Sequence, residues 1–145
     1  MGCGYQKQNR KTLDKDNISR YIASQKYIGS MDMKEFIRVM KALSDPNRVK
    51  ILKMLQYKTM CVCEIHAVLD IAQPTVSKHL KFLEHAGLVG FRKDGQWVNY
   101  HLTDGSKSPY AASLLGNLKY WIQDDPEVQH IVKQLKSIRR EDICK

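Results

Sequence analysis

Residues 61–87 read CVCEIHAVLDIAQPTVSKHLKFLEHAG, and this stretch predicts two helices joined by a tight turn. The first helix begins next to Cys61 and runs to Leu69, after which DIAQ forms the turn. The second helix follows from Pro74 and ends before Gly87, with its apolar side chains at helical spacing. Two short helices joined in this way predict a helix-turn-helix.

Two further helices are expected before this motif. Apolar residues at i, i+3, i+4 and i+7 predict a core helix near 33–43 with Phe36, Val39, Met40 and Leu43 buried. A second helix is expected to begin after Asp45, which is placed to cap it, with Pro46 at its first position. Its inward side chains are predicted to be Val49, Leu52 and Leu55.

A hairpin and two more helices are expected after the motif. The stretch LVGFRKDGQWVNYHL at 88–102 has two runs of strand-forming residues around Asp94-Gly95, which predicts a β-hairpin lying on the helices as a wing. Pro109 and Pro126 mark the starts of the last helices, the first expected over 109–122. The fold class is therefore mainly α with a small β-hairpin, a winged helix-turn-helix.

The domain organisation follows from the same pattern. Residues 1–30 are polar and are expected to form a tail, 31–125 the winged-helix domain, and 126–145 a C-terminal helix and tail. No apolar run is long enough to span a bilayer and the N-terminus lacks the apolar stretch of a signal peptide, so we expect a cytoplasmic protein with no membrane partner.

The net charge and the cysteine content reduce the number of possible functions. A net charge of +9 favours a polyanionic partner, with nucleic acid as the leading candidate. The four cysteines, at 3, 61, 63 and 144, do not suggest a disulfide scaffold in a cytoplasmic chain of this size. Metal binding or thiol chemistry is the expected role of the cysteines.

The paired cysteines Cys61 and Cys63 raise a geometric question. Side chains two apart on a regular helix point about 200° away from each other, so the two sulfurs could not face one ion there. Bringing them together is expected to unwind or tilt the first turn of the helix. Because that helix packs against the second helix of the motif, binding at the sulfurs would be coupled to DNA affinity.

The second helix of the motif carries the candidate DNA-reading residues. Short polar side chains near the start of such a helix contact base edges, while Lys and Arg hold phosphates. The candidates for contacts by this helix are Gln73, Thr75, Ser77, Lys78 and His79. Lys81 on the helix and Arg92 and Lys93 on the wing are expected to contact phosphates or the minor groove.

The order of these elements, together with ALSDPNRVKILKML, CVCEIH, QPTVSKHLKFLEHAGLV and RKDGQWVNYHL, resembles the ArsR/SmtB family of metal-responsive repressors over about residues 33–104. The resemblance implies a homodimer that binds operator DNA and leaves it when a metal or metalloid binds. Dimerisation in the family uses the first and last helices, here near 33–43 and 109–122. The turn of the motif has Asp70 and Ala72 where the family often has Gly and Ser, so the second helix lacks a good N-cap.

The C-V-C signature implies an inducer of trivalent arsenic or antimony bound by Cys61 and Cys63. The third ligand is open between Cys144, Cys3 and His66, since the arsenic-sensing pattern often has a cysteine at the position of His66. Imidazole is the weaker candidate because it suits zinc or copper better than a metalloid. We expect Cys61 and Cys63 to suffice for induction and a tail cysteine to tighten binding.

Three alternatives remain at this point. The cadmium/lead-sensing branch of the family adds cysteines of the N-terminal tail, which here would be Cys3. A thiol-redox switch would replace metal binding by oxidation. A C-x-C thiol oxidoreductase is the remaining class, although nothing besides the cysteines suggests an enzyme. The zinc site of the family is not expected, because residues 109–125 contain no His.

Overall fold

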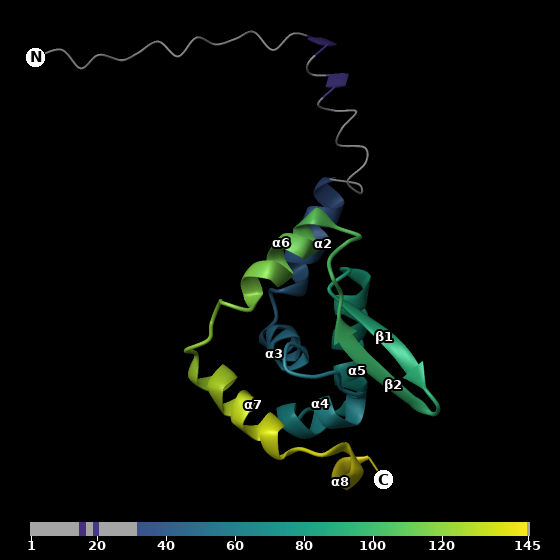
Figure 1. Cartoon of the computed structure of the whole chain (residues 1–145), viewed down its shortest axis with the longest axis vertical. Helices are drawn as coiled ribbons and strands as arrows, with labels where there is room; N and C mark the ends of the chain where they lie inside the picture. The colour runs from purple at the N-terminus through teal and green to yellow at the C-terminus, as the bar shows by residue number, and fades with distance from the viewer. Residues whose placement is uncertain (1–14, 17–18, 21–31, 145) are drawn as a thin grey trace, which may run out of the picture.

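The computed structural model describes residues 15–16, 19–20 and 32–144 (Figure 1). The helices of the last range are α2 (Met33–Ala42), α3 (Pro46–Leu55), α4 (Val62–Leu69), α5 (Gln73–His85), α6 (Pro109–Leu118), α7 (Pro126–Ser137) and α8 (Arg140–Ile143). The strands are β1 (Val89–Asp94) and β2 (Trp97–Leu102). The prediction of a mainly helical winged helix-turn-helix with one hairpin is confirmed.

Side-chain caps set where several helices begin. The Asp45 carboxylate accepts hydrogen bonds from the backbone N–H groups of Asn47 and Arg48 at 2.9 and 3.1 Å, so α3 begins where the sequence predicts. Ser108 caps α6 and Asp125 caps α7 in the same way. The N-cap of α5 is Ala72, whose side chain makes no capping bond, as expected from the sequence.

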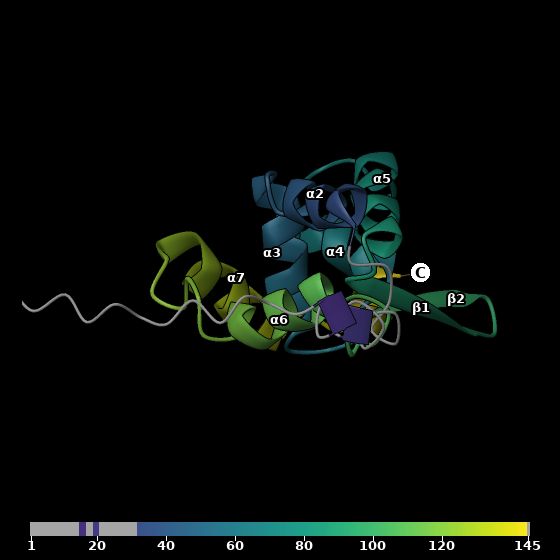
Figure 2. The ribbon, with the colours of Figure 1, turned by 90° about the horizontal axis from the view of Figure 1, so that it is seen from above.

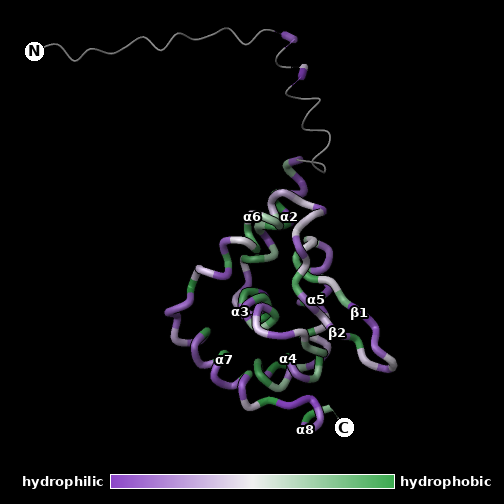
Figure 3. Tube along the Cα trace, viewed as in Figure 1, coloured by the Kyte–Doolittle hydropathy of each residue, from purple (hydrophilic) through white to green (hydrophobic). Residues whose placement is uncertain are grey.

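The hydrophobic core surrounds α3 in the middle of the molecule. Ile51, Leu52 and Met54 are fully buried, and α4 and α5 pack against α3 with apolar residues of the same core. Figure 3 shows the hydrophobic stretches of α3 at the centre of the trace. In this core Leu55 is buried as predicted, whereas Val49 is only partly buried. Helix α7 adds Ile131 and Leu135 to the same core, so its apolar face is satisfied within the chain.

The wing is a two-stranded antiparallel hairpin that projects away from the helices (Figure 2). Its register pairs Asp94 with Trp97, which leaves a two-residue loop at its end. An isolated bridge joins Met60 to Tyr100, with backbone hydrogen bonds of 3.1 and 2.8 Å between the two residues. The residue before Cys61 is therefore fixed to the middle of β2.

Helix α6 is shorter than predicted. It ends at Leu118 and not near residue 122, because the ammonium of Lys53 reaches its end. The side chain of Lys53 is buried, and its Nζ donates hydrogen bonds to the carbonyl oxygens of Leu118 at 3.0 Å and Trp121 at 3.1 Å. Burial lowers the pKa of this ammonium. Carbonyl groups that would otherwise lack donors at a helix end are thus satisfied by a side chain of α3.

The buried stripe predicted for the first helix also differs from the structure. Val39 and Ala42 face the core, whereas Phe36 and Met40 are each 38% exposed. Phe36 packs edge-on against Tyr110 of α6, with ring centroids 5.3 Å apart. Helix α2 therefore has two apolar sides, of which one is buried in the core and the other is partly exposed among residues 32–144.

In the part of the chain that the structure describes, no helix is both long and apolar enough to cross a membrane.

Gly105 in the loop before α6 provides a test of the fold. Its φ is +73° and an added Cβ would lie 2.4 Å from the Cα of Ala112 in α6. Gly95 at the tip of the wing has φ +59° but open space around the same position. We expect Gly95→Ala to lower the free energy of unfolding by about 1–2 kcal/mol through backbone strain alone. Gly105→Ala should cost roughly 1–3 kcal/mol more, because the backbone of α6 must shift. Urea unfolding measures both values, and equal losses would contradict this placement of α6.

Candidate metal centre and DNA-binding surface

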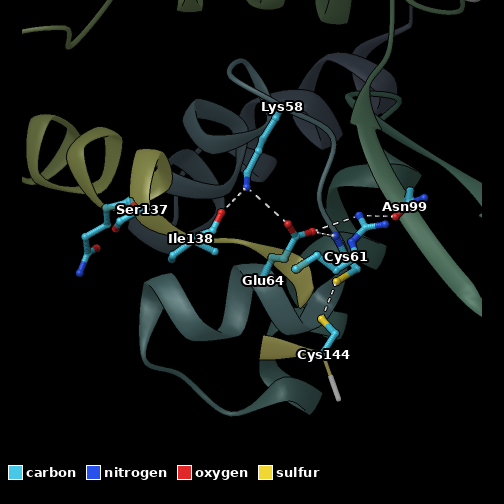
Figure 4. A network of polar contacts seen from close by, with 9 residues as sticks. Lys58, Cys61, Glu64, Asn99, Ser137, Ile138 and Cys144 are labelled. Carbon is cyan, nitrogen blue, oxygen red and sulfur yellow. Dashed lines mark hydrogen bonds and ion pairs between the residues drawn. The ribbon is translucent and has the colours of Figure 1, made fainter. Parts of the chain in front are cut away.

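Three cysteine sulfurs meet where α4 begins. Cys61 is the N-cap of α4, Cys63 lies in its first turn, and Cys144 follows α8 at the other end of the chain. All three Sγ atoms lie within 4.8 Å of one another, and those of Cys61 and Cys144 are 3.3 Å apart (Figure 4). The chain therefore brings together two sulfurs that are close in sequence and one that is 81 residues or more away.

The paired cysteines converge without unwinding of the helix, which corrects the mechanism expected from the sequence. Cys61 precedes α4 and has an extended backbone, with φ −89° and ψ 169°. The angle between side chains two apart on a helix therefore does not apply to this pair. Helix α4 is intact while both sulfurs face the same point.

The donor set of the cluster fits a soft, thiophilic ion. Within the described ranges, the cluster consists of sulfur atoms and includes no carboxylate or imidazole. Such ligands select soft metals and metalloids over Mg²⁺ or Ca²⁺. Cys61 is buried, but Cys63 and Cys144 are partly exposed, which leaves access from solvent. Burial raises the pKa of the Cys144 thiol, and its contacts with Cys61 and Cys63 raise it further, so ion binding there must displace a proton.

The other candidates for the third ligand lie elsewhere. The Nδ1 atom of His66 lies 2.5 Å from the carbonyl oxygen of Ile71, so this ring is engaged in the turn of the motif. His66 is not part of the sulfur cluster. Cys3 lies outside the described residues. Cys144 is thus the candidate that the structure places next to the pair.

A buried carboxylate positions the segment that carries Cys144. Glu64 is 3% exposed, and its carboxylate accepts hydrogen bonds from the backbone N–H of Cys61 at 2.8 Å and from Arg140 Nη2 at 3.1 Å. The ammonium of Lys58 lies 3.4 Å from the other oxygen of this carboxylate and donates to the carbonyl of Ile138 at 3.1 Å (Figure 4). Lys58 therefore holds Ile138 at the end of α7, and Glu64 holds Arg140 of α8, so that both lie next to the start of α4.

The pKa of Glu64 reflects this network. Burial alone raises the pKa of a carboxyl group, but the Cys61 N–H and the Arg140 guanidinium outweigh it and hold the pKa of Glu64 below its usual value. The group is thus ionised at neutral pH. The sequence indicated Glu64 as a capping acid, whereas Lys58 and Arg140 gave no signal, because their pairing with Glu64 depends on tertiary contacts.

The predicted DNA-contacting residues lie on two elements that pack together. Helix α5 packs against β1, the first strand of the wing. The exposed candidates on both elements are Gln73, Thr75, Ser77, Lys78, Lys81, Arg92 and Lys93. The structure thus leaves these polar and basic side chains open to solvent.

His79 differs from the other candidates on α5. Its side chain is only 13% exposed, and its Nδ1 lies 3.9 Å from Asp45 Oδ1 at the start of α3. The ring therefore faces the neighbouring helix, and we do not retain it among the base-reading residues.

Arg48 also connects α3 to α5, and the sequence did not indicate this contact. Its guanidinium stacks 4.3 Å from the ring centroid of Phe82, while its Nε donates to the carbonyl of Ala42 at 2.7 Å.

Comparison with known proteins gives a consistent result for the helix-turn-helix region. Residues 45–90 match the family model described as bacterial regulatory protein, arsR family. An uncharacterized HTH-type transcriptional regulator of Methanocaldococcus jannaschii is 46% identical over 67 residues, which cover 46% of this chain and 75% of that protein. The arsenical resistance operon repressor of Escherichia coli K12 is 35% identical over 100 residues, covering 68% and 83%. A CadC homolog of Staphylococcus aureus, a cadmium resistance regulatory protein, is 32% identical over 93 residues, covering 63% and 74%.

Solved structures with the same fold are also transcriptional regulators. The transcriptional repressor BigR from Xylella fastidiosa superimposes with a TM-score of 0.54 at 25% identity, covering 74% of this chain and 96% of that chain. The homodimeric winged helix-turn-helix domain of a possible ArsR-family regulator from Mycobacterium bovis gives a TM-score of 0.52 at 26% identity, covering 68% and 85%.

The sulfur cluster predicts which side chain joins Cys61 and Cys63 as a ligand. We expect Cys144→Ser to weaken Cd(II) binding roughly tenfold or more, since it removes a direct donor. His66→Ala should leave the affinity within about twofold, because its ring faces Ile71. Cadmium–thiolate absorbance gives both affinities. A loss of affinity in the His66 variant, with Cys144→Ser unchanged, would contradict the site.

Proposed function

The chain belongs to the arsR family of transcriptional regulators, and from this we propose that it is a repressor that binds operator DNA as a homodimer and releases it when trivalent arsenic or antimony binds Cys61 and Cys63. Cys144 is the proposed third ligand. The observation that carries the proposal is the group of three sulfurs within 4.8 Å at the start of α4, the first helix of the helix-turn-helix.

The inducer is inferred from the chemistry of the donors. A trivalent arsenical prefers three thiolates, and three cysteines of one chain already converge. The relatives named as arsenical resistance operon repressors, among them that of Escherichia coli, support the same assignment. When bound, the ion supplies three bonds that hold the sulfurs at one point.

Cadmium or lead is the second candidate for the inducer. It is favoured by the CadC homolog, which is 32% identical over 93 residues. The same three thiolates suit Cd(II) or Pb(II), and Cys3 is the proposed additional donor in that case. Membership of the arsR family does not identify the inducing ion. The ion is identified by measuring which one releases the DNA.

DNA binding is assigned to α5 and the wing. Gln73, Thr75 and Ser77 lie at the start of α5 and are exposed, which suits contacts with base edges in the major groove. The basic side chains are proposed to hold phosphates: Lys78, Lys81, Arg92 and Lys93.

The homodimer is proposed to form through α2 and α6. On α2, Phe36, Ile37 and Met40 are 38–40% exposed apolar side chains, and Phe36 contacts α6 through Tyr110. A face of this kind on a small helical domain indicates an interaction surface. The segments near 33–43 and 109–122 therefore remain the proposed interface, with Tyr120 and Trp121 exposed just after α6. The homodimeric neighbour from Mycobacterium bovis supports this assembly.

The proposed response links the sulfurs to DNA through packed elements. Helix α4 carries Cys63 and packs directly on α5. The cluster also joins this helix to the segment after α7 through Cys144. An equilibrium between DNA-bound and released forms shifts only if ligand binding favours one of them. In this proposal, the protein with one ion bound to all three sulfurs is the form that leaves the DNA.

The inducer assignment predicts the behaviour of cysteine variants. Cys61→Ser and Cys63→Ser should bind operator DNA with nearly wild-type affinity, because serine is a good N-cap at position 61 and neither cysteine is among the proposed DNA contacts. They should no longer release the DNA on addition of arsenite. Fluorescence anisotropy of labelled operator DNA, titrated with As(III), Sb(III), Cd(II), Pb(II), Zn(II) or hydrogen peroxide, measures the response. Release by arsenite that persists in both variants would refute the assignment.

The proposed DNA contacts predict that two variants lose DNA affinity in different ways. Ser77→Ala should weaken binding to operator DNA by about 1–3 kcal/mol while leaving binding to random DNA unchanged, because it removes a base contact. Lys81→Ala should weaken both and reduce the salt dependence by about one unit of slope, since it removes a phosphate contact. Anisotropy at several salt concentrations separates the two. The same effect of both variants on both DNA molecules would reject this division of roles.

A further inference from the structure

We propose that Arg140 of α8 and Asn99 of β2 form a latch through which the sulfur cluster holds the wing out of its DNA-bound position. This inference rests on the proposed function and names the residues that carry its regulation. Arg140 is a positioning residue in this account, because it contacts neither the ion nor DNA.

The latch begins at the sulfur cluster. The backbone N–H of Cys61 donates to Glu64 Oε2 at 2.8 Å, and Arg140 Nη2 donates to the same oxygen at 3.1 Å. Arg140 Nη2 also donates to Asn99 Oδ1 at 2.7 Å. Figure 4 shows this line of contacts running from Cys61 and Glu64 to Asn99 on the strand. A single guanidinium nitrogen thus bridges the first helix of the helix-turn-helix and the wing.

Cys144 and Arg140 belong to one short hydrogen-bonded segment. They lie four residues apart, and the backbone N–H of Cys144 donates to the carbonyl of Arg140 at 2.8 Å. Helix α8 packs on α4 and is only four residues long. A helix of that length has little stability of its own, so its position depends on tertiary contacts. Holding the Cys144 sulfur next to Cys61 therefore also holds the guanidinium of Arg140.

The wing end of the latch lies among residues proposed to contact DNA. Asn99 is directly opposite Arg92 in the register of the hairpin, so the two side chains project from the same face. Both residues line a hollow of about 410 Å³ together with Lys93 and His101. Arg140 thus fixes the wing beside two proposed phosphate contacts.

The backbone adds a second connection at the same place. Met60 precedes Cys61, and it pairs with Tyr100, the residue after Asn99. Strand β2 is therefore fixed by its backbone to the start of α4, while its Asn99 side chain is held by α8. The backbone bridge is expected to remain in all forms, and the side-chain contact is the part that ion binding can reinforce.

The latch makes ion binding and DNA binding compete with each other. With the three sulfurs held on one ion, Arg140 stays on Asn99 and the wing stays where the structure places it. Without the ion, α8 is free to leave and the wing can adapt to DNA. Each event then disfavours the other by the same factor, as linkage requires.

The latch is tested with Asn99→Ala and Arg140→Gln, and with Arg139→Gln as the matched control. Arg139 is exposed, and its side chain has no hydrogen bond or ion pair with any described residue, so this control makes the same charge change without breaking the contact. Asn99→Ala leaves the Arg140–Glu64 contact in place, so it separates the latch from the docking of α8.

The first measurement is the ratio of operator affinities without and with arsenite. This ratio should fall roughly tenfold in Asn99→Ala and Arg140→Gln but not in Arg139→Gln. Arsenite affinity of Asn99→Ala, followed by competition for the thiols, should stay within about threefold of wild type, because the variant keeps all three sulfurs and the Arg140–Glu64 contact that docks α8. A wild-type ratio in both latch variants overturns the proposal.

The second measurement needs neither inducer nor DNA. Hydrogen–deuterium exchange of the β2 amides should be faster in both latch variants than in Arg139→Gln, since the wing has lost a contact that restrains it. Unchanged exchange in both overturns the latch even if arsenite releases DNA from the wild type. Failure of arsenite to release DNA from the wild type refutes the proposed inducer, and the exchange result still decides whether Arg140 restrains the wing.

Discussion

The arrangement of the site depends on the contacts that the ionised carboxylate of Glu64 makes with its neighbours. A buried carboxylate is costly unless charged and hydrogen-bonding partners surround it. Here the backbone of Cys61 supplies one donor, and Arg140 and Lys58 supply the charges. Because Arg140 comes from α8 and Lys58 also binds the carbonyl of Ile138, satisfying this one group brings the end of the chain to the start of α4. The position of Cys144 follows from that docking.

The same constraint explains how a small winged helix can join a chemical signal to DNA binding. The start of α4 carries two of the three cysteines, α5 packs on α4, and β2 is attached to Met60, the residue before Cys61. Direct contacts therefore connect the sulfur cluster to both elements proposed to contact DNA, and its sulfurs come together with α4 intact. A sulfur donor from the far end of the chain makes the site sensitive to whether α8 is docked.

Local patterns predicted most of the fold, and tertiary contacts account for what they missed. The cap at Asp45 and the missing cap at Ala72 were readable because capping depends on neighbouring residues. The end of α6 was not readable, since Lys53 terminates it from another helix. For the site, Cys61 and Cys63 were indicated by spacing, and Cys144 was one of three candidates. Arg140 and Asn99 carried no sequence signal, because their roles exist only once the wing and the C-terminal segment meet at Glu64.

The central claim is that one chain supplies three sulfurs to one thiophilic ion. Arsenic X-ray absorption spectroscopy on the arsenite-loaded protein tests it most directly, because the number and type of the atoms bonded to arsenic are read without reference to DNA. The account predicts three sulfur neighbours in the wild type and in His66→Ala, and two sulfurs completed by oxygen in Cys144→Ser. Three sulfurs that persist in Cys144→Ser, or a nitrogen neighbour that disappears in His66→Ala, would contradict it.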